Sequence, residues 1–97
     1  MISDTQQNII INTIMPFNPV KIGIFGSMAR GEDTEQSDID ILYQLKDAVG
    51  IFNLVRMKDD LEKKLNKKVD LVSEKYIHPK LKPYIMGDLK IIYSDGR

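Results

Sequence analysis

The chain has 97 residues, which is enough for one modest hydrophobic core, so we expect a single domain over residues 1–97. Its 14 Lys and Arg residues equal its 14 Asp and Glu residues, and this zero net charge argues against a nucleic-acid partner, which would require a basic surface. The chain has no cysteine, which excludes disulfides, thiolate metal sites and a cysteine nucleophile.

The amino-terminal residues contain neither a basic segment nor a long apolar run. A signal peptide requires both, and a membrane-spanning helix requires about 20 consecutive apolar residues. We therefore expect a cytoplasmic protein with no membrane partner.

The first half of the chain predicts one helix and two strands. Ser3 and Gln6 have the spacing of a capping box, which favours a helix over residues 4–15. Residues 20–25 are a short β-branched run and predict a strand, followed by a turn at residues 26–31 and a polar loop. Residues 38–45 alternate polar and apolar side chains, which indicates a strand with two different faces.

The second half predicts two helices and two strands. A helix over residues 51–66 would present one apolar face, made of Ile51, Leu54, Val55, Leu61 and Leu65. Residues 69–72 and 89–93 predict strands, and residues 78–86 a short helix interrupted by prolines. Strands separated by helices of this length favour an α/β or α+β fold, with helices packed on a β-sheet.

Two aspartates at the start of the second predicted strand are candidate metal ligands. Side chains two residues apart in a strand share a face, so Asp38 and Asp40 project together, away from Ile39, Ile41 and Tyr43. Two adjacent carboxylates repel each other unless a cation lies between them, and oxygen ligands suit Mg²⁺ or Mn²⁺. Asp70 opens another predicted strand, and three aspartates on adjacent strands would form a two-metal phosphoryl-transfer site.

The turn before these aspartates is a candidate phosphate site. Gly26 follows a strand, so that backbone N–H groups can point at an anion without a Cβ in the way. Ser27 adds a hydroxyl donor. Arg30 is placed either to contact phosphate or to brace the carboxylates, and the sequence does not choose between these roles.

Two other phosphate- or cation-binding motifs do not fit these residues. A P-loop requires Lys and Ser or Thr where Glu32 and Asp33 stand, and an EF-hand starting at Asp33 requires Gly and Glu where Asp38 and Gln44 stand. Each glycine or aspartate alone is typical of a turn, but the whole string is too specific a pattern for turns alone and favours a functional site. We expect the remaining polar and aromatic residues to be structural, with His78 on the surface, Lys63, Lys64, Lys67 and Lys68 on a solvated face, and Tyr43, Tyr76, Tyr84 and Tyr93 in packing roles.

The string Gly26-Ser27-Met28-Ala29-Arg30-Gly31, followed by Ser37-Asp38-Ile39-Asp40, resembles the signature of the DNA polymerase β-like nucleotidyltransferase superfamily. The small size and the segment Val69-Asp70-Leu71-Val72 are similar to its minimal nucleotidyltransferase branch. This resemblance implies a mixed β-sheet, two Mg²⁺ ions and transfer of a nucleoside monophosphate, with ATP the expected donor. Gly26 and Ser27 would bind the triphosphate, Asp38, Asp40 and Asp70 the metals, and Asp70 would help to deprotonate the acceptor.

Members of this branch are commonly paired with a HEPN-type toxin and act as its antitoxin, in some cases by adenylylating a toxin tyrosine. We therefore expect a Mg²⁺-dependent transferase whose acceptor is a protein hydroxyl on such a toxin. The alternative is a binding module that neutralises the toxin by contact alone, although it would have no physical reason to keep three mutually repelling carboxylates. Modification of a small molecule is disfavoured because no further domain is left to enclose it.

Overall fold

The computed structural model describes residues 1–96, and its centre is a mixed four-stranded sheet in the order β3-β2-β1-β4. Strand β1 (Pro19–Phe25) pairs antiparallel with both β2 (Ile39–Leu45) and β4 (Lys90–Ser94). Strand β3 (Val69–Ser73) pairs parallel with β2. The expected class, a mixed sheet with helices packed on it, is confirmed.

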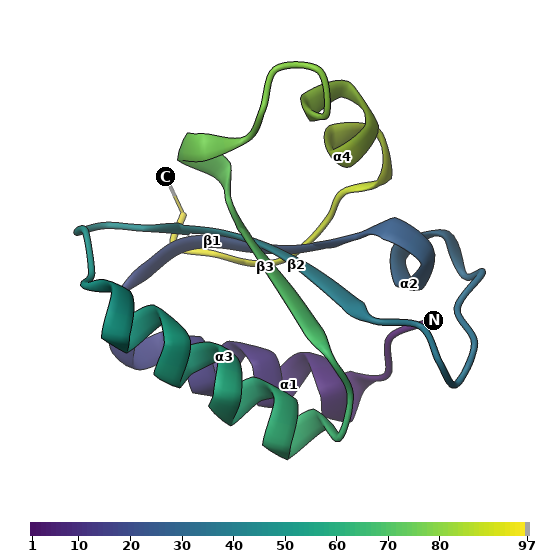
Figure 1. The fold of residues 1–97 in the computed structure, drawn as a ribbon, viewed down its shortest axis with the longest axis horizontal. Coiled ribbons are helices and arrows are strands. Elements are labelled where there is room, and N and C mark those ends of the chain that lie inside the picture. Colours follow the sequence, from purple (N-terminus) through teal and green to yellow (C-terminus); the bar gives the residue numbers. More distant parts are fainter. Residues whose placement is uncertain (97) are drawn as a thin grey trace.

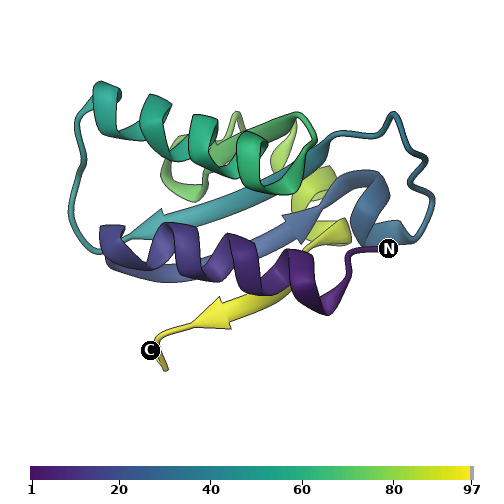
Figure 2. The same ribbon diagram turned by 90° about the horizontal axis from the view of Figure 1, so that it is seen from below.

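The helices are distributed unequally over the sheet. Helices α1 (Asp4–Ile14) and α3 (Ile51–Leu65) cover one face, whereas α4 (Lys82–Asp88) stands on the opposite side (Figure 1). Figure 2, which looks from below, shows α1 and α3 side by side in front of the strands. The short helix α2 (Gly26–Arg30) continues directly from the end of β1. Two 3-10 turns, at Met15–Phe17 and Glu74–Tyr76, complete the described chain.

Helix α1 begins at the predicted capping box. The backbone N–H of Gln6 donates to Ser3 Oγ over 3.1 Å, and the backbone N–H of Ser3 donates to Gln6 Oε1 over 2.9 Å. These two bonds satisfy donors that the first helical turn cannot pair internally. Ile10 and Ile14 then lie fully buried on the side facing the sheet.

The apolar face predicted for α3 is confirmed at Leu54, Leu61 and Leu65 and is wrong at Ile51 and Val55. Met57, Leu61 and Leu65 are the buried residues of this helix, while Ile51 and Val55 are 71% and 53% exposed. Successive helical residues are 100° apart, so Val55 points well away from that buried stripe, whereas Ile51 lies near its edge, in the first turn, and is exposed all the same. The prediction grouped them with it because it counted apolar residues and left out Met57.

The core lies between the sheet and helices α1 and α3. It consists of residues from both helices, from α2 and from the three strands β1, β2 and β3: Ile10, Ile14, Ile22, Ile24, Met28, Ala29, Ile39, Ile41, Met57, Leu61, Leu65 and Val69. In contrast, α4 contains no buried residue. Within residues 1–96, no helix has both the length and the apolar character needed to cross a membrane.

The carboxyl-terminal third departs from the prediction in detail. The predicted helix over residues 78–86 begins later, at Lys82, with Pro83 in its first turn. Tyr76 and Tyr84 are 79% and 76% exposed, so the expectation that they pack is wrong for both. Tyr43 is buried, Tyr93 packs against the core, and His78 is exposed, as expected.

Candidate active site

Strand register brings two of the predicted aspartates together. Asp40 of β2 and Asp70 of β3 are direct partners in the parallel ladder. Their neighbours in the ladder, Ile39 and Val69, are buried beneath α1 and α3. Because side chains alternate along a strand, both carboxylates lie on the opposite face, which we call the open face. Asp38 lies two residues before Asp40, immediately outside β2, and is exposed.

The carboxylates influence one another electrostatically. The pKa of Asp40 is raised above its ordinary value of 3.8, first by burial and then by the negative charges of Asp70 and Asp38. The positive charge of Arg30 opposes this rise. Asp40 therefore lies in a field of excess negative charge, and a bound cation would relieve its repulsion.

The carboxylates are not arranged as a complete set of metal ligands. Among residues 1–96, no three His, Cys, Asp or Glu side chains are arranged to hold an ion together. The register confirms that Asp40 and Asp70 share a face, but side-chain rotation would have to complete a coordination shell. Their oxygen atoms are suitable ligands for a divalent cation, and a cation would relieve their mutual repulsion. Metal binding by Asp38, Asp40 and Asp70 stays a prediction.

Gly26 lies directly against Asp40, and we call the place where Gly26, Asp40 and Asp70 meet the open-face corner. Its backbone has a positive φ of 74°, which residues with a side chain rarely adopt. A Cβ at this position would overlap Asp40 Oδ2 and lie 3.1 Å from Asp40 Cγ. The glycine therefore lets the chain turn from β1 into α2 directly against the carboxylate.

The start of α2 is open to an anion. No side chain caps this helix, so its first N–H groups lack the partner that a capping residue would supply. Ser27 occupies the first turn of this helix, and its predicted contact with phosphate stays a prediction. The second glycine of the motif has a different role, because Gly31 ends α2 in a left-handed conformation, with its N–H bonded to the carbonyl of Ser27.

Arg30 braces α2, although not against the predicted carboxylates. Its Nη1 lies 2.6 Å from Asp88 Oδ2 at the end of α4, and its Nε lies 3.0 Å from Glu32 Oε2. Hydrogen bonds to Glu32 and Asp88 raise the pKa of Arg30. A contact between Arg30 and phosphate would therefore compete with Asp88, a residue to which the sequence drew no attention.

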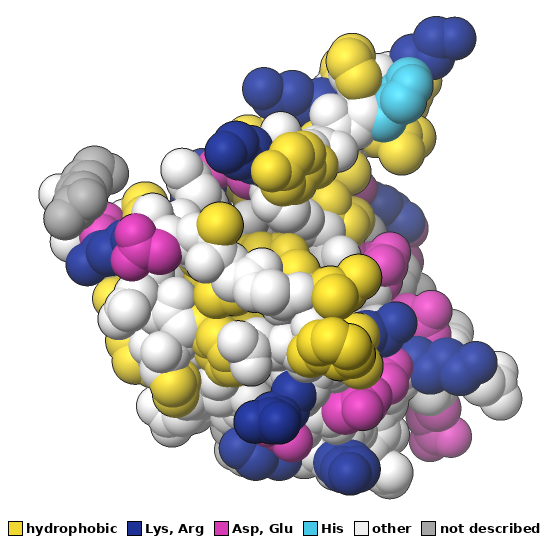
Figure 3. Space-filling model, turned by 60° about the vertical axis from the view of Figure 1, so that its left-hand side comes forward, with side chains coloured by type: hydrophobic (Ala, Val, Ile, Leu, Met, Phe, Trp, Pro, Cys, Tyr) yellow, Lys and Arg dark blue, Asp and Glu magenta, His cyan; other side chains and the backbone are white. Residues whose placement is uncertain are grey.

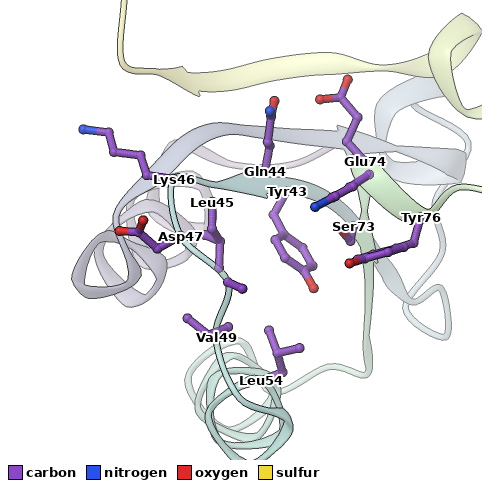
Figure 4. A pocket seen from close by; sticks show the side chains of 12 residues that line it. Tyr43, Gln44, Leu45, Lys46, Asp47, Val49, Leu54, Ser73, Glu74 and Tyr76 are labelled. Atoms are coloured by element: carbon purple, nitrogen blue, oxygen red, sulfur yellow. The ribbon is translucent and has the colours of Figure 1, made fainter.

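A cavity of about 570 Å³ opens at the other end of the same strands. Figure 4 shows the ring of Tyr43 pointing toward Leu54 of α3, with Tyr76 at the rim. Burial raises the pKa of the Tyr43 phenol, while a hydrogen bond with Ser73 opposes the rise. None of the three aspartates lines this cavity, so its size does not connect it to the chemistry of the carboxylate corner.

Residues 8–97 match the family described as Polymerase beta, Nucleotidyltransferase. The chain therefore belongs to this nucleotidyltransferase family. The match includes every residue of the corner described above, from Gly26 to Asp70. It confirms the resemblance drawn from the glycine and aspartate motifs, and the protein is a nucleotidyltransferase.

Individual relatives agree with this assignment. A Methanocaldococcus jannaschii protein, provisionally named a protein adenylyltransferase, is 40% identical over 79 residues, which cover 81% of this chain and 85% of the relative. A chain of a toxin–antitoxin crystal structure with AMP-PNP superimposes with a TM-score of 0.82 at 24% identity, covering 93% of this chain and 74% of the other.

A further similar structure comes from Shewanella oneidensis. It is described as a tri-AMPylated HEPN toxin in complex with an MNT antitoxin, and one of its chains matches with a TM-score of 0.75 at 22% identity. The match covers 93% of this chain and 71% of the other. At these identities the two structural likenesses establish the fold that the chains share.

Proposed function

We propose that this nucleotidyltransferase transfers AMP from ATP to a hydroxyl group of a partner protein, and that it thereby acts as the antitoxin of a HEPN-type toxin. The observation that carries this proposal is the open-face corner, in which Asp40 is paired with Asp70 in register and the backbone of Gly26 closely approaches the Asp40 carboxylate. The relative named as a protein adenylyltransferase supports the choice of acceptor.

Each part of the corner has a role in holding the nucleotide. Gly26 and Ser27 receive the triphosphate at the uncapped start of α2, where backbone N–H groups are available. Asp38, Asp40 and Asp70 would hold two Mg²⁺ ions, which when bound neutralise the phosphate charge and stabilise the attacking and leaving oxygens. A contact between Arg30 and the phosphates would compete with its ion pair to Asp88.

The transfer itself is a substitution at phosphorus. The acceptor hydroxyl oxygen forms a bond to the α-phosphorus of ATP, and the bond from that phosphorus to the bridging oxygen breaks, releasing pyrophosphate. Asp70 accepts the proton of the hydroxyl, because a carboxylate on the exposed side of the corner is free to meet an incoming acceptor. The chain thus provides positioning and charge rather than a covalent intermediate.

The surroundings of the site favour a protein as acceptor. Figure 3 shows basic and apolar side chains on a segment that projects from the body of the molecule. In the segment that contains α4, Leu81 and Tyr84 are 56% and 76% exposed. The carboxylates lie outside the cavity lined by Tyr43, on the open face, where a partner protein can bring its own surface to them. The toxin–antitoxin complexes of similar fold make a HEPN toxin the first partner to test.

The test is to incubate the protein with a HEPN-like protein encoded beside it, ATP and Mg²⁺, and to measure the partner's mass. We expect the partner to gain the mass of one or more AMP groups with the wild-type protein and none with Asp70→Ala. A partner that stays unmodified and yet is inhibited would favour the contact-only antitoxin. A partner that is neither modified nor inhibited would overturn both functions.

A further inference from the structure

Lys67 contacts the segment that leads into the active site. It lies between α3 and β3, after Asn66, which ends α3 in a left-handed conformation with φ of 52°. Its Nζ lies 3.0 Å from the carbonyl oxygen of Glu35 and 3.4 Å and 3.5 Å from those of Ser37 and Thr34. An ammonium group has three donors and no acceptor, so one lysine can serve three carbonyls.

The contacted residues form a tight turn. The N–H of Ser37 donates to the carbonyl of Thr34 over 3.0 Å, and the N–H of Thr34 donates to Ser37 Oγ over 2.8 Å. Carbonyl oxygens on one side of this turn converge on a single cation, and such charge-assisted bonds are stronger than neutral ones. Lys67 therefore fixes the orientation of the turn through these carbonyl oxygens.

The last of these carbonyls belongs to the peptide bond that joins Ser37 to Asp38. Fixing a peptide plane fixes the direction in which the next residue leaves it. On the far side of Asp38, the N–H of Ile39 donates to the carbonyl of Lys68 over 2.9 Å. Asp38, an exposed residue outside the strand, is thus held from both sides by the junction between α3 and β3.

The neighbouring contacts make this junction firm. Glu62 Oε2, one turn before the end of α3, accepts the N–H of Val69 over 2.9 Å. Val69 is buried and opens the strand that carries Asp70. Lys67 therefore extends from a fixed base, and its side chain is only partly exposed. This differs from the solvated lysine that its place at the end of a helix predicts.

We propose that Lys67 is a positioning residue of the nucleotidyltransferase site, which holds the Thr34–Ser37 turn by its carbonyls and so orients the Asp38 carboxylate toward the metal–nucleotide complex. The proposal rests on the proposed function, because it presupposes that Asp38 contributes to metal–nucleotide binding. In this role Lys67 acts through the turn rather than by contact with substrate or metal. Residues that orient a metal ligand typically contribute about tenfold to one hundredfold in metal affinity or activity.

The test compares Lys67→Met with Lys68→Met, because each variant removes one positive charge. The side chain of Lys68 is exposed, and the hydrogen bond to Ile39 uses its backbone, which the substitution leaves in place. Amide hydrogen exchange is measured first on the nucleotide-free proteins. We expect Lys67→Met to lose protection at the Ser37 N–H, and Lys68→Met to retain it. Both should retain protection at the Ile39 N–H.

The affinity for Mn²⁺-ATP is measured next on the same proteins by calorimetry. We expect Lys67→Met to bind about tenfold more weakly than wild type and Lys68→Met to bind nearly as well. Equal affinity in the two variants would overturn the positioning role, even if the turn loosens. A wild-type protein that binds no Mn²⁺-ATP would overturn the proposed function instead. In that case, equal amide hydrogen exchange at the Ser37 N–H in Lys67→Met and Lys68→Met would also show that Lys67 does not order the turn.

Discussion

The two faces of strand β2 differ in what they contribute to the protein. On the covered face, Ile39 and Ile41 are fully buried beneath α1 and α3. On the open face, Asp40 lies between Gly26 and Asp70, and its pKa is raised by burial and by like charges. The covered face therefore stabilises the fold, whereas the open face, although Leu42 is also fully buried there, holds at Asp40 a repulsion that the fold has to overcome.

This division shows how a small chain accommodates a charged site. The alternation of the strand separates buried and charged side chains by a single residue, so no additional element is needed to carry the site. Repulsion among carboxylates costs stability, which burial of the adjacent isoleucines offsets. The comparison predicts that changes on the two faces have different effects, which the following variants separate.

The largest effect is expected from Asp40→Asn. Removing this carboxylate should abolish measurable transfer, because the metal–carboxylate contact supplies several kcal/mol of transition-state stabilisation, equivalent to a loss of at least about a thousandfold. The fold should be retained or slightly stabilised, since a repelling charge is lost. Transfer rates and urea unfolding of the same preparations measure the two effects.

Ile41→Val is the matched variant on the covered face. It removes one buried methylene group and should lower the free energy of unfolding by about 0.5–1.5 kcal/mol. Transfer by the folded protein should stay near the wild-type rate, because Ile41 faces away from the carboxylates. A large loss of transfer in Ile41→Val, or unchanged transfer in Asp40→Asn, would contradict the division between the faces.

A smaller effect is expected at the turn between β1 and α2. Gly26→Ala should weaken ATP binding and destabilise the fold by at least about 1–2 kcal/mol, because the positive φ disfavours a Cβ that would also overlap Asp40. Gly87→Ala is the control, since a Cβ there meets nothing within 4 Å in α4 and should stabilise the helix by about 0.5–1 kcal/mol. Thermal unfolding and calorimetry distinguish them. Equal behaviour of the two alanines would contradict the close approach at Gly26.

The raised pKa of Asp40 predicts a pH dependence of stability. In the unfolded chain Asp40 loses its proton near its ordinary pKa of 3.8, whereas in the folded chain it keeps the proton to higher pH. Its contribution to stability is therefore fully present below 3.8 and is lost as the pH rises through the folded pKa. Asp40→Asn lacks this loss, so its stability relative to wild type should increase across that window. Urea unfolding at a series of pH values tests the sign, and a relative stability that decreases with pH would refute it.

The smallest effect is expected from Asp88→Asn, which removes a partner of Arg30. The ion pair is partly exposed, so the thermal midpoint should change little. ATP affinity should increase modestly if Arg30 turns to phosphate, because Asp88 no longer competes for the guanidinium. Calorimetry at low salt measures the change. A decrease in affinity would show that Asp88 holds Arg30 in its working position.

The sequence predicts the local pattern of the site well. The alternation along residues 39–45 indicates which side chains share a face, and the buried neighbours of Asp40 confirm it for that residue. A glycine at position 26 can be explained, because both the positive φ and the close approach to Asp40 require a residue without a Cβ. Each of these features depends on residues near one another in the chain, and the element boundaries depend on similar local signals.

Contacts between distant segments are what the sequence does not predict. Nothing near Lys67 indicates that its side chain meets carbonyl groups more than 25 residues earlier in the chain, because backbone acceptors leave no trace in side-chain identity. The ion pair between Arg30 and Asp88 likewise depends on where α4 stands. The exposed Ile51 and Val55 show that an apolar residue at helical spacing still requires a facing surface to be buried.

The central claim is that the open-face carboxylates form a metal-dependent nucleotide site. Calorimetric titration of ATP into the wild-type protein, with and without Mg²⁺, tests it most directly. The account predicts tight binding with Mg²⁺, weak binding without it because the carboxylates repel the triphosphate, and loss of the Mg²⁺ effect in Asp40→Asn. Equal affinity of the wild-type protein in the two conditions would contradict it.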